Sequence, residues 1–180
     1  MGVVIEVSGQ YALFSRPELK VERVSYDMIT PSAARGLLES IYWHPGIQWK
    51  IDKIHVMHPI RFTNIRRNEV SAKLSAANAL TVMKGSNEPL YISASACIQQ
   101  RASLLLREVR YVIEAHFDLT EKAAPGDNAD KFYAIIMRRL QKGQCFQHPY
   151  LGSREFPADV RAAEHPIAKA AYEGERDLGF

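Results

Sequence analysis

The end of a helix predicted within residues 28–49 carries three side chains that could take part in catalysis or binding: Tyr42, Trp43 and His44. An imidazole with a pKa of ~6.5 can act as a general acid or base, whereas a phenol with a pKa of ~10 can donate a proton or orient a substrate. A helix end also offers spare backbone carbonyls beside these rings. The pattern is compatible with a ligand site and with a corner of the core, and the residue types alone leave both open.

The basic residues fall into three groups, although the formal net charge is only +3. A mild excess of this kind does not by itself imply nucleic acid, so the grouping matters more than the sum. The guanidinium fork matches phosphate geometry, which makes the groups candidate RNA-backbone contacts; solvated surface bases are the alternative. The groups are Arg61, Arg66 and Arg67, then Arg101, Arg107 and Arg110, then Lys131, Arg138, Arg139 and Lys142.

The sequence predicts no metal site, disulfide or membrane span. His55 and His58 are three residues apart on a predicted strand, so they point to opposite faces and cannot share a metal. Cys97 and Cys145 belong to no CxxC pair, which favours a reducing interior. No run reaches the ~18 apolar residues that a membrane span needs. We therefore expect a cytoplasmic protein without cofactors.

A helix that begins after Thr30 is expected to position Tyr42 and its neighbours. Thr30 can cap the helix through its side-chain oxygen, and Pro31 suits the first helical position. Apolar residues then recur at helical spacing, while Arg35 and Glu39 form an i,i+4 pair on the exposed side. A Pro-Gly dipeptide at residues 45–46 ends the helix.

Period-two alternation predicts strands on both sides of this helix. One strand runs from Val3 to Leu13, with Gly9 as a candidate bulge. In the next, the apolar positions change phase at Asp52-Lys53, which a β-bulge or tight hairpin explains. Residues 63–89 are long for a connection and indicate a functional flap or a disordered segment, with a short strand possible at residues 90–95.

The second half repeats the pattern of strand and helix. Residues 109–119 form the clearest strand, and residues 99–106 either extend it or pair with it as a hairpin. Asp127 or Asn128 can cap a second helix that runs to about Lys142. Residues 161–171 have a weak helical pattern.

The element order is βαββαβ, which is typical of an α+β, ferredoxin-like (RRM-like) core: an antiparallel sheet with two helices on one face. We expect one such domain over residues 1–160, with a flap or hairpin inserted at about residues 63–98. Residues 161–180 are expected to begin a C-terminal extension. Many unrelated functions use this fold, so the fold alone does not identify one.

Several blocks of sequence carry a family resemblance, in family order and over nearly the whole chain. They are VERVSYDMITPSAARGLLESIYWHP, IDKIHVMHPIRF followed by RRNEV, RYVIEAHFDLT, GQCFQHPYLGSREF and RDLGF. Together they resemble the Cas-five proteins of type I-C CRISPR systems, the "d" subtype, in the repeat-associated RNA-binding (RAMP) superfamily. Members of that family usually continue for several tens of residues beyond RDLGF, so we expect the chain to be shortened there.

The resemblance implies both an activity and a place in a complex. Such proteins bind the hairpin repeat of the CRISPR precursor RNA and cut it at the hairpin base without metal. They then stay on the 5′ handle of the crRNA as a subunit of the Cascade interference complex. Cleavage by the neighbouring 2′-hydroxyl would leave a cyclic phosphate. The implied partners are repeat RNA, the Cascade backbone and large subunits, and, as a further candidate, target DNA near the PAM.

The family's proposed catalytic group is a Tyr at the end of the first helix with adjacent Lys and His at the start of the second. Tyr42 and Lys131 match, but Phe132 holds the His position. Lysine suits the negative charge of a phosphorane, whereas Phe132 supplies no base and heads an apolar stripe. His44 is the nearest replacement in sequence. His116 lies on a strand face that could meet RNA or be hydrogen bonded within the sheet.

Three hypotheses follow. In the first, the protein is a metal-independent endoribonuclease that uses Tyr42, Lys131 and His44. In the second, it is a non-catalytic subunit that holds the crRNA handle, which Phe132 at the expected His position favours. The third, an unrelated ferredoxin-like interaction domain, is disfavoured by the ordered blocks.

Overall fold

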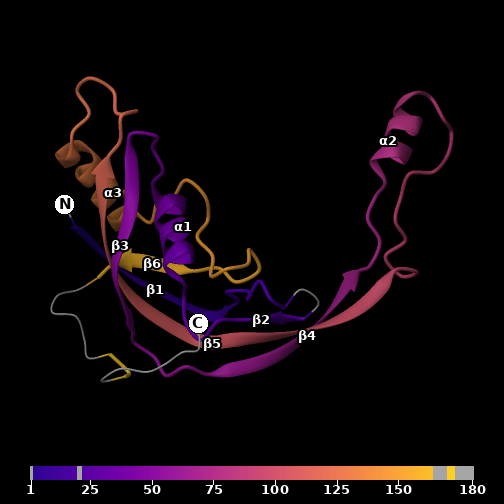
Figure 1. Cartoon of the computed structure of the whole chain (residues 1–180), viewed down its shortest axis with the longest axis horizontal. Coiled ribbons are helices and arrows are strands. Elements are labelled where there is room, and N and C mark those ends of the chain that lie inside the picture. The colour runs from indigo at the N-terminus through magenta and orange to yellow at the C-terminus, as the bar shows by residue number, and fades with distance from the viewer. Residues whose placement is uncertain (1, 20–21, 164–169, 173–180) are drawn as a thin grey trace. The chain divides into compact units, whose positions relative to one another are not determined.

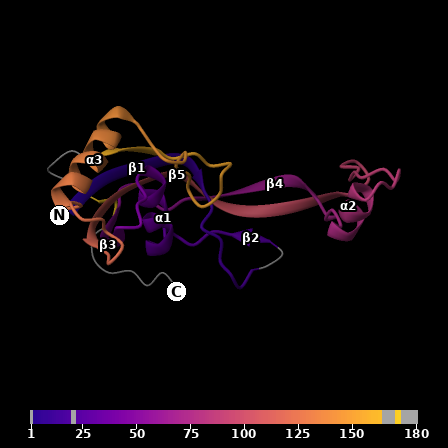
Figure 2. The same ribbon diagram turned by 90° about the horizontal axis from the view of Figure 1, so that it is seen from above.

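The computed structural model describes residues 2–19, 22–163 and 170–172. The chain divides into two compact units: residues 64–103 form one, and the residues before and after them form the other. The larger unit contains α1 and α3, the two helices that carry the candidate catalytic residues (Figures 1 and 2). No helix within the described residues is long and apolar enough to cross a membrane.

Four strands and two helices of the larger unit build the expected α+β core. Both β1 and β3 pair antiparallel with β5, which lies between them, and β6 pairs antiparallel with β1. The two helices lie on the same face of this sheet (Figure 1). The elements are β1 (Gly2–Ala12), α1 (Pro31–Ile41), β3 (Ile47–Val56), β5 (Ile98–Leu119), α3 (Ala129–Lys142) and β6 (Asp159–Ala162). The ferredoxin-like prediction is therefore confirmed.

The core forms between the sheet and the two helices. Alternate residues of β1 and β5 are buried because successive side chains of a strand point to opposite faces. Each helix adds one buried stripe at helical spacing. The main contributors are Val3, Ile5 and Val7 of β1, Tyr111, Ile113 and Ala115 of β5, Ala34, Leu37, Leu38 and Ile41 of α1, and Phe132, Ile136 and Leu140 of α3.

The helix caps agree with the sequence. The Thr30 side-chain oxygen accepts a hydrogen bond from the Ala33 N–H at 3.2 Å, and Pro31 is the first helical residue. In α3 the Asn128 side chain accepts from the Lys131 N–H at 2.8 Å, and Gly143 closes the helix in the left-handed region at φ 63°. The first helix nevertheless ends at Ile41, so Tyr42 is its C-cap in an extended conformation.

The phase change in β3 is a bulge, as predicted: its register against β5 shifts between Ile51 and Lys53. The predicted bulge at Gly9 is wrong, because β1 keeps one continuous register with β5 past this residue. A Cβ added at Gly9 would collide with the Leu151 side chain and lie 3.1 Å from the Pro157 carbonyl oxygen. Gly9 therefore permits close packing rather than a bulge.

The unit of residues 64–103 contains a helix that the sequence did not reveal. It is α2 (Ala76–Met83), capped by Ser75, and none of its side chains is buried. The flanking strand β4 (Phe62–Val70) pairs with β5, whose first residues run through this unit as one continuous strand. The predicted short strand at residues 90–95 is wrong, because these residues form turns and irregular structure.

Two shorter segments also differ from expectation. A two-residue strand, β2 (Arg23–Val24), pairs with β5 within what the sequence presents as a charged connection. The weak helix predicted at residues 161–171 is wrong at its start, because Arg161 and Ala162 belong to β6. Residues 164–169 of that prediction lie outside the described residues.

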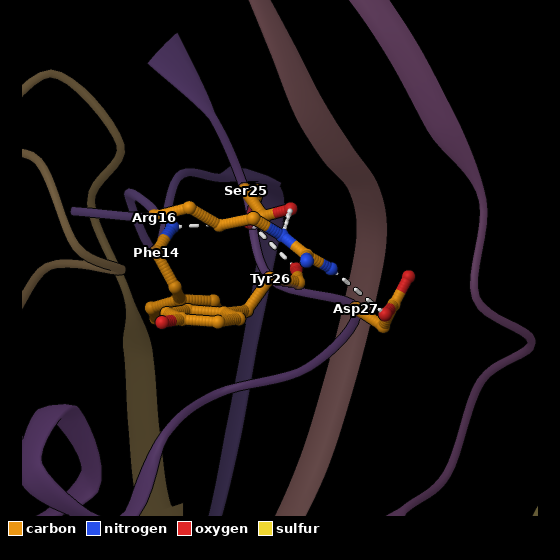
Figure 3. A network of polar contacts seen from close by, with 5 residues as sticks. All are labelled: Phe14, Arg16, Ser25, Tyr26 and Asp27. Carbon is orange, nitrogen blue, oxygen red and sulfur yellow. Dashed lines mark hydrogen bonds and ion pairs between the residues drawn. The ribbon is translucent and has the colours of Figure 1, made fainter. Parts of the chain in front are cut away.

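A buried serine fastens β2 to the end of β1 (Figure 3). The Ser25 hydroxyl accepts from the Phe14 N–H at 3.1 Å and donates to the Tyr26 carbonyl at 2.8 Å. Above it, the Arg16 guanidinium lies 4.9 Å from the centre of the Tyr26 ring and bonds Asp27 at 3.2 Å. This network fixes the chain that leads into α1.

Replacing Ser25 by alanine should destabilise the fold. The substitution leaves the buried Phe14 N–H without its acceptor, which costs about 1–3 kcal/mol. The free energy of unfolding, measured by urea denaturation, should fall by this amount. Ser32→Ala, at an exposed serine of α1, is the control and should change stability by less than about 0.5 kcal/mol. Equal effects of the two substitutions would contradict the role given to Ser25.

Candidate active site

Tyr42 lies where α1 ends, with its ring mostly buried and only 7% of the residue exposed. Its ring centre is 6.2 Å from that of Phe132 on α3. Burial raises the pKa of the phenol above its ordinary value, with Asp127 adding to the rise and Arg139 and Lys131 opposing it. The hydroxyl is therefore protonated at neutral pH, which suits a hydrogen-bond donor rather than a base.

Arg139 of α3 covers the Tyr42 ring. Its guanidinium carbon is 4.9 Å from the ring centre, and its Nη1 donates to the Ile41 carbonyl at 2.6 Å. The carbonyl belongs to the last residue of α1 and also accepts from the Phe146 N–H at 3.3 Å, so a cation of α3 helps to cap the end of α1. Arg139 thereby fixes both the Tyr42 ring and a positive charge beside it.

Lys131, in the first turn of α3, is held by Asp127. The Lys131 Nζ lies 2.7 Å from one carboxylate oxygen of Asp127, and the other oxygen accepts from the Ala124 N–H at 3.0 Å. The hydrogen bond from Lys131 holds the pKa of Asp127 below its ordinary value, and the same bond raises the pKa of Lys131. The ammonium is therefore charged and positioned while its side chain stays exposed to solvent.

His44 lies beside Tyr42 and against Phe132. Its ring is nearly parallel to that of Tyr42, at 7° with centres 6.4 Å apart, and its centre is 5.0 Å from that of Phe132. The Nδ1 atom accepts a hydrogen bond from the Gly46 N–H at 3.0 Å. An accepting nitrogen carries no proton, so the neutral ring carries its proton on Nε2. In this geometry His44 is a donor through Nε2.

Phe132 occupies the position where the resembling family has a histidine, and it is 1% exposed. Its ring meets Phe117 of β5 edge-on at 6.4 Å and also contacts Tyr42 and His44. Phe132 is thus a core residue, as its place at the head of the apolar stripe predicts. It supports the two titratable rings but adds no titratable group.

The structure brings Tyr42, Lys131 and His44 together in one unit, where a phenol, an imidazole N–H and two cations surround the end of α1. Two cations can stabilise the charge of a pentacovalent phosphorane, and the phenol and imidazole can donate hydrogen bonds to phosphate oxygens. The arrangement is suited to phosphoryl transfer without a bound cofactor. Within the described residues, no group of three or more His, Cys, Asp or Glu side chains could hold a metal.

The other candidate bases are spread over the two units. Arg66, Arg67 and Arg101 belong to residues 64–103, and Arg101 bonds Gln99 at 3.1 Å. In the larger unit Arg61 bonds Glu108 at 3.0 Å and Arg107 is exposed nearby, its N–H donating to the Arg61 carbonyl. Arg138 and Lys142 are exposed on α3.

The sheet face away from the helices carries paired charges. His116 bonds Asp52 at 2.7 Å, so the hydrogen-bonded alternative for this histidine is the one observed. His55 bonds Glu114 at 2.6 Å, and Lys50 pairs with Asp118. These contacts join side chains of β3 to side chains of β5 across the strands, which leaves fewer of them available to a phosphate backbone.

Sequence reasoning missed two contributors to the site. Asp127 was considered only as a helix cap, although its i,i+4 spacing to Lys131 is a usable signal for an ion pair on the first turn. The sequence predicted Arg139 as a contact to the RNA backbone and not as a neighbour of Tyr42. Its stacking on Tyr42 depends on the packing of α3 against the end of α1, and the sequence gives no sign of it.

Known proteins resemble this chain over nearly all of its length. The family described as CRISPR-associated protein (Cas_Cas5), subtype Cas5d, matches residues 2–178. A protein of Mannheimia succiniciproducens named CRISPR pre-crRNA endoribonuclease Cas5d is 48% identical over 98% of this chain and 81% of its own length. A protein of the same name from Thermus thermophilus is 43% identical over 86% of this chain and 61% of its own length.

Among solved structures, a crystal structure of a CRISPR-associated protein has the same fold with a TM-score of 0.69. It is 23% identical to this chain, and the match covers 99% of this chain and 77% of that one. At this identity the likeness shows the fold alone.

The surroundings of Tyr42 predict how its phenol titrates. Subtracting the ultraviolet titration of Tyr42→Phe from that of the unsubstituted protein isolates this phenol, whose pKa should lie above the ordinary 10.0 because burial disfavours phenolate. Arg139→Gln removes a cation that opposes this rise, so the pKa should increase further. Asp127→Asn removes a negative charge and should lower it. A phenol that titrates below 10.0 in the unsubstituted protein would contradict the burial.

Proposed function

The chain belongs to the Cas5d family of CRISPR-associated proteins, and we propose that it cleaves CRISPR precursor RNA at the base of the repeat hairpin. Two relatives that carry the name pre-crRNA endoribonuclease are 48% and 43% identical to it. After cleavage it stays on the 5′ handle of the crRNA as a subunit of Cascade. We propose that the chain acts in the cytoplasm.

One observation carries the assignment of the active site: Arg139 lies 4.9 Å from the centre of the Tyr42 ring, and both Arg139 and Lys131 act electrostatically on the Tyr42 phenol to lower its pKa. These interactions support placing the phenol and the two cations around one small anion. A scissile phosphate fits this requirement, because its charge grows as the phosphorane forms.

The reaction follows from the groups present. The 2′-hydroxyl loses its proton to solvent and forms a bond to phosphorus, while the bond from phosphorus to the 5′-oxygen breaks. Lys131 and Arg139 stabilise the negative phosphorane oxygens, and Tyr42 donates a hydrogen bond that orients the phosphate. His44, with its proton on Nε2, donates a hydrogen bond to the leaving 5′-oxygen, which takes its proton from solvent. The products are a 2′,3′-cyclic phosphate and a 5′-hydroxyl.

The remaining arginines and Lys142 bind the RNA backbone. RNA stems are recognised by shape and phosphate contacts, so the arginines and lysines of each unit are suited to contact phosphates. We assign this role to Arg61, Arg66, Arg67, Arg101, Arg107, Arg138 and Lys142, with Arg139 at the scissile phosphate. The Cascade backbone and large subunits are the proposed protein partners, with target DNA near the PAM as a further candidate.

Phe132 supports a second candidate function. An active site without the histidine expected beside Lys131 has lost one proton-transfer group, and a buried phenylalanine cannot replace it. In that case the same surface holds the crRNA handle while cleavage is slow or absent. The two functions differ in chemistry and not in where RNA binds.

Removing Lys131 separates cleavage from binding. With cognate repeat RNA in EDTA, the unsubstituted protein should produce RNA that ends in a cyclic phosphate, and Lys131→Ala should abolish this product. Affinity for the hairpin should stay within several-fold, because one phosphate contact among many is lost. Lys53→Ala, at an exposed lysine of β3, is the matched control and should cut normally. Tight binding of intact RNA by the unsubstituted protein would instead establish the handle-binding function.

Removing His44 tests the hydrogen-bond donor. His44→Ala should slow cleavage by about 100-fold or more, the usual cost of removing one donor that acts on developing charge, while leaving RNA affinity unchanged. His58→Ala, an exposed histidine that bonds the Glu108 carbonyl, serves as the control. Unchanged cleavage by His44→Ala across neutral pH would exclude this role.

A further inference from the structure

A cleft of about 550 Å³ lies between α1 and the loop of residues 144–152. Three aromatic side chains line it and remain open to solvent: Trp43 is 57% exposed, Phe146 62% and Tyr150 36%. Exposed large aromatics gathered around one cavity are unusual for a surface that only meets water.

The cleft and the candidate active site are built on neighbouring residues, because Trp43 follows Tyr42 directly in the chain. The loop is tied to the same helix end, because the N–H groups of Phe146 and Gln147 both donate to the Ser40 carbonyl, at 2.8 and 2.9 Å. The end of α1 therefore contributes one residue to the phosphate site and the next residue to the cleft.

The charges around the cleft indicate how such a ligand would lie. Glu39 lines the helix side, where a negative carboxylate repels phosphate. A second cavity of about 400 Å³ adjoins the first, since Gln147 and Tyr150 line both, and it adds His148 and Arg154. A phosphate chain would follow these two side chains, while an uncharged ring would enter between the aromatics.

We infer that this aromatic cleft binds an unpaired nucleobase of the repeat RNA beside the scissile phosphate, by stacking on Trp43 and its aromatic neighbours. The inference rests on the proposed function. Unpaired bases next to a hairpin are the part of an RNA that proteins read by stacking, and every base presents a π-face of the required kind. The occupant is thus a single-stranded RNA segment rather than an apolar protein side chain.

The stacking is tested by comparing how a substitution changes affinity for intact RNA and for RNA that lacks the bases next to the cut. The probes are the cognate repeat hairpin with its single-stranded flank and the same RNA with abasic nucleotides next to the cut, which keep the phosphate charge but remove the bases. Trp43→Ala should bind the intact RNA about 5- to 100-fold more weakly. On the abasic RNA the same substitution should change affinity by less than about twofold.

Further variants guard against loss of folding. Trp43→Phe keeps a ring and should restore most of the affinity, and Phe146→Ala should repeat the pattern of Trp43→Ala at a second, more exposed position. Tyr91→Ala, at an exposed tyrosine of the other unit, should leave affinity for both RNAs unchanged. Each variant's free energy of unfolding is measured alongside.

The outcomes distinguish this inference from the proposed function. Equal losses on intact and abasic RNA, or no loss on either, overturn the stacking role even if the protein cuts RNA normally. Unchanged RNA affinity with loss of assembly into Cascade would show that the cleft is a protein-docking surface and also overturns it. If Trp43→Ala weakens binding of intact RNA but not of abasic RNA, and the protein never cuts RNA, the role of the cleft is supported and the endoribonuclease function is overturned.

Discussion

The backbone carbonyls at the end of α1 set a constraint that organises the surrounding structure. A helix leaves its last carbonyls without intrahelical donors, and buried carbonyls must find partners. Here Ser40 receives two N–H groups from the loop of residues 144–152, Ile41 receives the guanidinium of Arg139, and Tyr42 receives the indole N–H of Trp49 at 3.1 Å. The loop, α3 and β3 are thereby all fastened to one turn. The contacts that provide hydrogen-bond donors to these carbonyls also bring together the side chains proposed for catalysis.

Local signals in the sequence sufficed for the parts of the fold that depend on neighbouring residues. Thr30 and Asn128 cap helices by bonds to residues three positions away, and the phase change at Asp52-Lys53 reveals a bulge because side chains alternate strictly along a strand. Gly9 was misread because its reason is a contact with Leu151, far away in the chain. The helix α2 was missed although Ala76, Ala79, Leu80 and Met83 recur at helical spacing; none of its side chains is buried.

The candidate site was predictable to a similar degree. The pairing of Tyr42 with Lys131 came from family resemblance, since nothing in the spacing of two residues 89 positions apart (131 − 42) implies contact. The roles of Arg139 and of the His44 tautomer depend on packing and on one backbone bond from Gly46. The unit of residues 64–103 was harder to predict for another reason. The buried hydrophobic side chains described in the chain all lie outside it, so hydrophobic patterning gave little information about its structure.

The contacts of Phe132 limit which residue its position can hold. Its ring packs against both Tyr42 and His44, so an imidazole at this position would bury polar nitrogens among three aromatic rings and lose those contacts. The effect of a Phe132→His substitution therefore depends on the residues around it, and a histidine placed there without changes to its neighbours would not supply an accessible base. A redesign of the proton chemistry at this site has a better starting point in the half-buried His44 than in the fully buried Phe132.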